Sequence, residues 1–258
     1  MWIDSHAHLN DPDFKDDYHD VIANAVANQV GAIVVVGFDL ESSQKAVELA
    51  ATEPMIWAAV GIHPHDAKNW SPTIATELKI LLQRPKVVAL GEIGLDYHYN
   101  YSPKDEQIQA FRDQLRMAGE LQKPVIIHNR EAHGDTMTIL EETLRETGER
   151  KFLASGVMHC FGGSREVAVQ CLQLGLLVSF AGPLTFTNAV KLREVASGLP
   201  MDKILIETDS PYLSPHPFRG KRNEPGRVGL VGSKLAEIKG ISVEEVMQVT
   251  TDNCRTLF

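Results

Sequence analysis

Two histidines separated by one residue are the first chemically informative feature of the sequence. His6 and His8 flank Ala7 in a stretch that predicts a β-strand. Because residues i and i+2 of a strand point to the same face, we expect the two imidazoles to lie side by side. The alternative is that they simply fill a core, but unpaired imidazoles are costly to bury. The pattern therefore favours a shared metal ion.

Further polar side chains follow apolar runs elsewhere in the chain. Glu92, His128, His159 and Asp209 each stand at the carboxyl end of such a run. Taken singly, each has an ordinary explanation, such as a hydrogen-bonded structural histidine or an aspartate that caps a loop. Together they predict one site, because the carboxyl ends of parallel barrel strands meet at a single face. Clustered histidines and carboxylates suit Zn²⁺ and Mn²⁺, and Mg²⁺ as the share of carboxylate and water rises.

Barrel geometry divides these six candidate ligands into two groups. The last strand of a closed barrel lies beside the first, so we expect Asp209 near the histidine pair. His128 and His159 follow neighbouring strands and can hold a second ion, with Glu92 as a bridge between the two. Two ions ~3.5–4 Å apart can activate a water and stabilise a leaving oxygen. We predict catalytic roles for Glu92 as the bridge and for Asp209 as the base that orients or deprotonates the water.

The elements that must position these side chains are short β-branched runs that alternate with amphipathic stretches. Alternation of this kind predicts parallel strand pairing, and near-continuous apolar runs indicate strands covered on both faces. A chain of 258 residues suits a (β/α)₈ barrel, which needs roughly 250. We therefore predict an α/β fold, a single TIM barrel over residues 1–258, with an open doubly wound sheet as the alternative. The eight predicted strands are Ile3–Leu9, Ala32–Gly37, Ile56–His63, Val87–Leu95, Val125–Arg130, Leu153–Cys160, Leu177–Ala181 and Ile204–Asp209.

Helical spacing marks the connecting segments. The apolar residues of Phe111–Leu121 and Ile139–Leu144 recur at helical intervals. The segment Ser242–Leu257 predicts an extra C-terminal helix, because Ser242 and Glu245 have the spacing of a capping box.

Composition limits the partners and the compartment. The formal net charge is −9, so any attraction to nucleic acid must come from bound metal or from local basic residues. Three cysteines without C-x-x-C spacing favour a reducing compartment. No secretory signal or long apolar run is visible. We expect a cytoplasmic protein without membrane association, and the sequence gives no sign of an obligate protein partner.

Seven ordered blocks, spread over nearly the whole chain, resemble the TatD family of metal-dependent deoxyribonucleases, which are amidohydrolase-like TIM barrels. No single H-x-H is specific, but seven blocks in order are. The blocks are Asp4–Leu9, Gly61–Pro64, Gly91–Tyr97, His128–Arg130, His159–Ser164, Glu207–Leu213 and Arg219–Pro225.

The resemblance implies a metal-dependent hydrolase that cleaves phosphodiester bonds of DNA, often single strands from the 3′ end. It implies two divalent ions, Mg²⁺ or Mn²⁺ in function with Zn²⁺ also compatible. It places His63 in the pocket near a substrate phosphate. Two positions depart from the commoner family pattern, since Ala7 stands where cysteine is frequent and Asn10 where aspartate is frequent. The ligands it implies are those predicted above, namely His6, His8, Glu92, His128, His159 and Asp209.

Two charged residues are expected to support the site. Arg130 lies two residues beyond His128, so its guanidinium could clamp a phosphate by two hydrogen bonds or pair with a carboxylate. Glu207 shares a strand face with Asp209. We expect Glu207 to orient a ligand or a water, although it could instead pair with a base.

A compact basic loop follows the last predicted strand. It contains Arg219, Lys221 and Arg222, which are expected to contact a nucleic-acid backbone and to offset the acidic surface. Tyr97 and Tyr99 follow the fourth strand, where they could stack against bases or simply pack.

Two other functions compete with the nuclease. The same barrel could hydrolyse a small molecule, such as a phosphotriester, a lactone or an amide, and the acidic charge favours this alternative. A barrel that binds without chemistry should have lost ligands, whereas all six are present.

Overall fold

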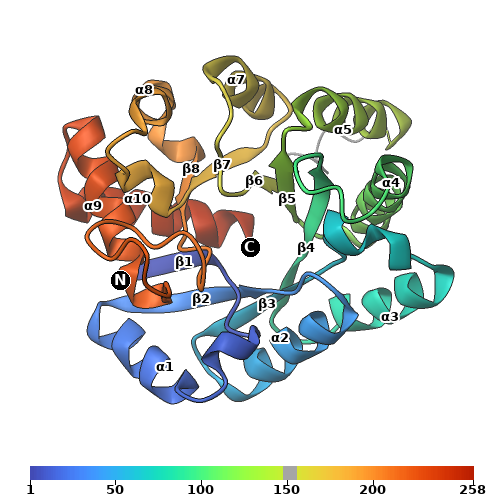
Figure 1. The fold of residues 1–258 in the computed structure, drawn as a ribbon, viewed down its shortest axis with the longest axis horizontal. Helices are drawn as coiled ribbons and strands as arrows, with labels where there is room; N and C mark the ends of the chain where they lie inside the picture. The colour runs from blue at the N-terminus through green and yellow to red at the C-terminus, as the bar shows by residue number, and fades with distance from the viewer. Residues whose placement is uncertain (148–155) are drawn as a thin grey trace.

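Eight parallel β-strands form a nearly closed barrel in the computed structural model, which describes residues 1–147 and 156–258 (Figure 1). Each strand pairs with the next along the chain. The first and last strands meet through a single bridge between Ala7 and Ser210. The predicted TIM barrel is confirmed, and the open sheet is wrong because the two edges meet. The strands are β1 (Trp2–Ala7), β2 (Val30–Val36), β3 (Ile56–Val60), β4 (Val87–Asp96), β5 (Val125–Arg130), β6 (Gly156–Met158), β7 (Leu177–Phe180) and β8 (Ile204–Ile206).

Helices lie outside the ring of strands, as expected when each crossover returns the chain to the same end of the sheet (Figure 1). The extra C-terminal helix is confirmed, and its Ser242 hydroxyl accepts the Glu245 N–H at 3.1 Å. None of the helices in the two described ranges is long and apolar enough to cross a membrane. The helices are α1 (Tyr18–Ala27), α2 (Leu40–Thr52), α3 (Pro72–Leu82), α4 (Lys104–Leu121), α5 (His133–Thr147), α7 (Arg165–Gln173), α8 (Val190–Gly198), α9 (Val228–Lys239) and α10 (Val243–Leu257).

The apolar strands serve two separate cores. Along β2, Ile33 and Val35 pack in the layer between strands and helices, whereas Val34 packs inside the barrel. Burial on both faces explains why these strands read as continuous apolar runs. Cys254 and Leu257 of α10 join the interior core. Because α10 thus covers the amino-terminal end of the strands, the carboxyl end remains for the functional groups.

Several strands are shorter at that end than the sequence predicted. The predicted ends Leu9, His63 and Asp209 lie two or three residues beyond the strands, because the chain leaves the sheet at the barrel mouth. Asp209 has a φ of 56°, in the left-handed region, which a strand residue cannot adopt. Residues 153–155 of the predicted sixth strand lie outside the described residues.

A glycine sets the distance between the two strands that carry Glu92 and His128. Gly94 has a φ of 143°, and a Cβ there would lie 2.0 Å from the backbone oxygen of His128. Only glycine fits so close an approach of two backbones. The absence of a side chain at this position therefore brings β4 and β5 together directly below the site.

Candidate metal centre

The structure brings all six predicted ligands to the mouth of the barrel. They come from the ends of β1, β4, β5, β6 and β8, and five of the six are buried, with His128 partly exposed. Their role as ligands stays a prediction, whereas their proximity is a feature of the fold. The residues are His6, His8, Glu92, His128, His159 and Asp209.

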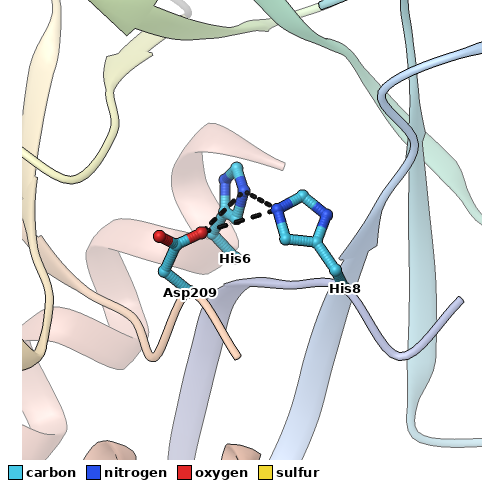
Figure 2. A group of neighbouring side chains, drawn as sticks. All are labelled: His6, His8 and Asp209. Carbon is cyan, nitrogen blue, oxygen red and sulfur yellow. Dashed lines mark hydrogen bonds and ion pairs between the residues drawn. The ribbon is translucent and has the colours of Figure 1, made fainter. Parts of the chain in front are cut away.

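The first group joins residues at the ends of the first and last strands, β1 and β8 (Figure 2). The Nε2 atoms of His6 and His8 lie 3.1 Å apart, and Asp209 Oδ1 lies 3.7 and 3.5 Å from them. Glu92 Oε2 lies 3.4 and 3.6 Å from the same two nitrogens. Ligand atoms around a tetrahedral ion with bonds of 2.0–2.1 Å are about 3.3 Å apart. The spacing of these four atoms therefore fits one shared cation.

The tautomer of His8 supports this arrangement. Its Nδ1 lies 2.9 Å from the backbone oxygen of Val36, so Nδ1 carries the proton and Nε2 presents a lone pair to the site. Asn10 donates from Nδ2 to the same oxygen at 3.1 Å and to the oxygen of Ser42 at 2.9 Å. An ionised aspartate could not donate these bonds. The departure from the family pattern at position 10 thus changes the support behind His8.

The second group surrounds the other oxygen of Glu92. Glu92 Oε1 lies 2.7 Å from His128 Nδ1, 2.9 Å from His159 Nε2 and 3.4 Å from His63 Nε2. His159 Nε2 and His128 Nδ1 are 3.5 Å apart. One carboxylate therefore faces a different histidine group with each oxygen, as a bridge between two ions must. His63 is brought into the same buried group.

Electrostatics favour a cation in this cavity. Burial alone would raise the pKa of Glu92, but His159 and His63 outweigh it and hold the pKa well below its usual value. Burial also opposes ionisation of Asp209, yet its bond to His8 and the charge of neighbouring histidines lower its pKa. Burial would lower the pKa of His159, but Glu92 and Glu207 raise it well above its usual value. The buried carboxylates thus draw a proton to His159, and a divalent ion would supply the same positive charge.

Among the buried side-chain atoms of the described residues that lack a hydrogen-bond partner, two belong to this cluster. They are His6 Nδ1 and Glu207 Oε2. Glu207 Oε1, by contrast, lies 3.2 Å from His159 Nδ1 and accepts the N–H of Cys160 at 2.8 Å. His6, His159 and Glu207 form a further group whose ligand atoms lie within 4.8 Å of one another. Orphaned buried atoms among histidines and carboxylates fit a site built for divalent cations.

Asp96 is a contributor that the sequence reasoning missed. Its Oδ2 lies 3.1 Å from His128 Nε2 and 3.0 Å from His65 Nε2. Its Oδ1 accepts the backbone N–H groups of His98 and Tyr99 at 3.0 and 2.9 Å. These bonds outweigh burial and lower the pKa of Asp96, so it is an ionised acceptor. His128 must then donate from Nε2, which leaves Nδ1 as its ligand atom.

Strand alternation could have identified this residue. Alternate residues of a strand share a face, so Glu92, Gly94 and Asp96 lie on the same face of β4. Asp96 is therefore on the face that carries the bridging Glu92. Asp96 also caps the following loop, since its Oδ1 accepts two backbone N–H groups there.

Asp96→Asn is expected to weaken binding of one metal ion by roughly 10–100-fold, because carboxylates behind a ligand histidine fix its orientation. Competition with a chromogenic chelator measures the two affinities separately. Glu131→Gln is the matched control, since Glu131 is an exposed rim carboxylate that pairs with His98. Unchanged affinity for both ions in Asp96→Asn would remove this residue from the site.

The residues predicted to contact the substrate differ in whether their side chains already have partners within the protein. Arg130 is exposed and its guanidinium lies 4.7 Å from the ring centre of Tyr99. No ion pair of Arg130 occurs among the residues that the structure describes, so the carboxylate partner considered above is absent there. Tyr97 is engaged, because its hydroxyl donates to Asp135 at 2.7 Å and Lys104 covers its ring.

The basic loop is only partly available. Arg222 makes two hydrogen bonds to the carboxylate of Asp17, at 2.9 and 2.5 Å. Arg219 and Lys221 are exposed, and within residues 1–147 and 156–258 neither pairs with a carboxylate. The guanidinium of Arg219 lies 4.2 Å from the ring centre of Phe186.

Comparison with known proteins gives the chain its relatives. The family described as TatD related DNase matches residues 3–258. The metal-dependent hydrolase YabD of Bacillus subtilis, itself uncharacterized, is 46% identical over 258 residues, which cover 100% of this chain and 99% of that protein. The 3′-5′ ssDNA/RNA exonuclease TatD of Klebsiella pneumoniae is 35% identical, covering 99% of this chain and 97% of that protein.

A solved structure has the same architecture. The TatD homologue YJJV of Escherichia coli K12 superposes with a TM-score of 0.92 at 31% identity. The match covers 100% of this chain and 97% of that one.

Proposed function

The chain belongs to the TatD family of metal-dependent hydrolases, and from this premise we propose that it is a nuclease that shortens single-stranded DNA from the 3′ end. One observation carries the proposal, namely that Glu92 directs one oxygen to each of two histidine groups. Such a bridge suits a pair of ions, and paired ions are typical of phosphodiester hydrolysis. The relatives named as exonucleases support the choice of substrate.

Each side chain then has a defined task. His6 and His8 would hold the first ion with Asp209, while His128 and His159 would hold the second, and Glu92 would contact both. Two divalent ions, when bound, would lower the pKa of the attacking water and balance charge on the phosphoryl oxygens.

The remaining steps fall to the protein itself. Asp209, at the edge of the first group, would orient the water and accept its proton. Glu207 would hold His159 through its Nδ1. His63 would contact the scissile phosphate, because its Nε2 lies 3.4 Å from Glu92 Oε1 in the second group. Arg130, two residues beyond His128 on β5, would contact the neighbouring phosphate.

Electrostatic attraction of DNA should depend on the basic loop. Neutralising Arg219 and Lys221 to glutamine is expected to flatten the salt dependence of single-stranded DNA binding by about 0.7 per charge, roughly 1.4 in total. Adding Arg222→Gln should change the slope less, because Asp17 already balances that charge. Titration of a labelled oligonucleotide at several salt concentrations measures the slope.

The control for this loop is the pair Lys79→Gln and Lys234→Gln on the outer helices α3 and α9, which removes the same charge elsewhere. An unchanged slope in the loop variant, or an equal change in the control, would exclude the loop from DNA binding.

The proposed activity is tested with chelator-stripped protein and single-stranded DNA labelled at either end. Mg²⁺, Mn²⁺ or Zn²⁺ is then added back. Stepwise shortening from the 3′ end, dependent on metal, is the expected result. Shortening from the 5′ end would reverse the polarity, and internal cleavage would make the enzyme an endonuclease.

The acidic net charge favours a second candidate function. A net charge of −9 suits a hydrolase for a small phosphotriester, lactone or amide better than one for a polyanion. Turnover of such compounds by protein that binds metal but leaves every DNA substrate intact would establish this alternative.

A further inference from the structure

Two exposed tyrosines stack on each other beside the metal centre. Tyr99 and Tyr101 follow β4, and 45% and 58% of their surfaces are exposed. Their ring centres are 5.3 Å apart with 20° between the planes. The guanidinium of Arg130 lies over the Tyr99 ring. Flat aromatic faces and a cation thus stand together at the rim of the barrel.

These rings are held in place by the groups that orient His128. The Tyr99 N–H donates to Asp96, the carboxylate that His128 and His65 share. The His65 ring meets Tyr99 and Tyr101 edge-on, with centres 5.4 and 4.8 Å away.

Ring contacts also connect the tyrosines to the second histidine group. The His65 ring lies 4.3 Å from the ring of His63, which in turn approaches Glu92. The His65 ring therefore links the tyrosine pair to His63 of the second histidine group.

Packing alone does not account for this pair. Tyr97, the third tyrosine of the segment, is partly buried and bonds through its hydroxyl to Asp135. For the hydroxyls of Tyr99 and Tyr101 no hydrogen bond occurs among the described residues. Tyrosine is enriched at binding interfaces, and a contiguous patch of exposed rings marks an interaction site.

We propose that Tyr99, Tyr101 and Arg130 form a nucleobase platform, on which an unpaired base of the substrate stacks on Tyr101 while Arg130 contacts the adjoining phosphate. This inference rests on the proposed function and names the part of the substrate that this rim binds. Every base has a π face, so the platform tolerates any sequence. A paired base inside a duplex has both faces covered by its neighbours, so the platform selects single-stranded ends.

The test compares Tyr101→Leu with Tyr101→Phe, because phenylalanine keeps the ring and leucine removes it. The probe is a short oligonucleotide with a phosphorothioate 3′ end, bound to Mg²⁺-loaded protein and followed by fluorescence anisotropy. Tyr101→Leu is expected to weaken binding by about 5–100-fold, and Tyr101→Phe by much less.

A second set of probes carries one abasic position, moved stepwise from the 3′ end. When the abasic position is the one that meets the platform, the affinity of wild-type protein should fall by the same factor that Tyr101→Leu causes on the intact probe. The affinity of Tyr101→Leu itself should not fall further on that abasic probe. Trp57→Leu is the control, since Trp57 is exposed and lines a pocket with Met1 and Phe258, away from the mouth.

Three outcomes would overturn the proposal. Equal binding by Tyr101→Leu and wild type, in protein that still shortens DNA, removes the platform and leaves the nuclease. Additive losses at every abasic position make Tyr101 a structural residue only. Wild-type protein that neither binds nor shortens any single strand removes both the platform and the proposed function.

Discussion

Glu92→Gln is expected to lower turnover by at least about 10³-fold and to remove metal from both histidine groups. Glutamine keeps the size of the side chain but loses the negative charge. One of its two terminal atoms becomes an NH₂ donor, which must face either the His6 and His8 nitrogens or those of His128 and His159. No orientation of the amide can serve both groups.

Metal content per chain and the rate of DNA shortening are measured on the same preparation. Glu131→Gln is the control, because Glu131 is an exposed carboxylate near the same rim. A Glu92→Gln protein that retains two tightly bound ions would show that the two groups are independent and that Glu92 is no bridge.

Asp209→Asn is expected to lower turnover by at least about 10²-fold and to leave the fold intact, because an amide cannot accept the proton of the attacking water. Asparagine preserves the side-chain size, and the backbone bond from Asp209 N–H to the His6 oxygen remains. The φ of 56° at this position is also tolerated by asparagine.

Turnover at saturating DNA, metal content and the far-ultraviolet circular dichroism spectrum separate loss of chemistry from loss of structure. Asp202→Asn is the matched control, since its side chain is 71% exposed and lies before β8. Full turnover in Asp209→Asn would assign the proton transfer to another group.

The barrel followed from the sequence because burial on both faces leaves a clear pattern in each strand. In β2 every residue is apolar, and β5 begins with three apolar residues before its polar end, so both could be recognised without knowing which strands pair. Strand ends at the mouth were predicted less well. Their positions depend on where the backbone turns, as at Asp209, and apolar patterns do not record backbone angles.

The grouping of the six candidate ligands was also predictable, since each follows an apolar strand and all strands run in one direction. The individual partners of Asp96 and Arg222 were not predictable. Asp96 acts through partners on other segments, and Arg222 meets Asp17 across more than half of the chain. A single sequence carries periodicity within an element but gives little information about which loop side chains meet.

The narrow contact between β1 and β8 means that the first histidine group could affect how firmly the barrel is closed. Few backbone bonds cross this seam, among them those from Asp209 N–H to the His6 oxygen and from His8 N–H to the Ser210 oxygen, and side-chain bonds of Asp4 and Ser5 add to them. His6 and His8 stand on one side of it and Asp209 on the other, roughly 200 residues away along the chain. A cation between them would act as a reversible cross-link, comparable in its effect on chain entropy to a disulfide that closes a long loop. Chelation should then loosen the seam before the remaining strands, so that amide hydrogens of β1 and β8 exchange first. The ion that serves the reaction would also hold the first and last strands of the barrel together.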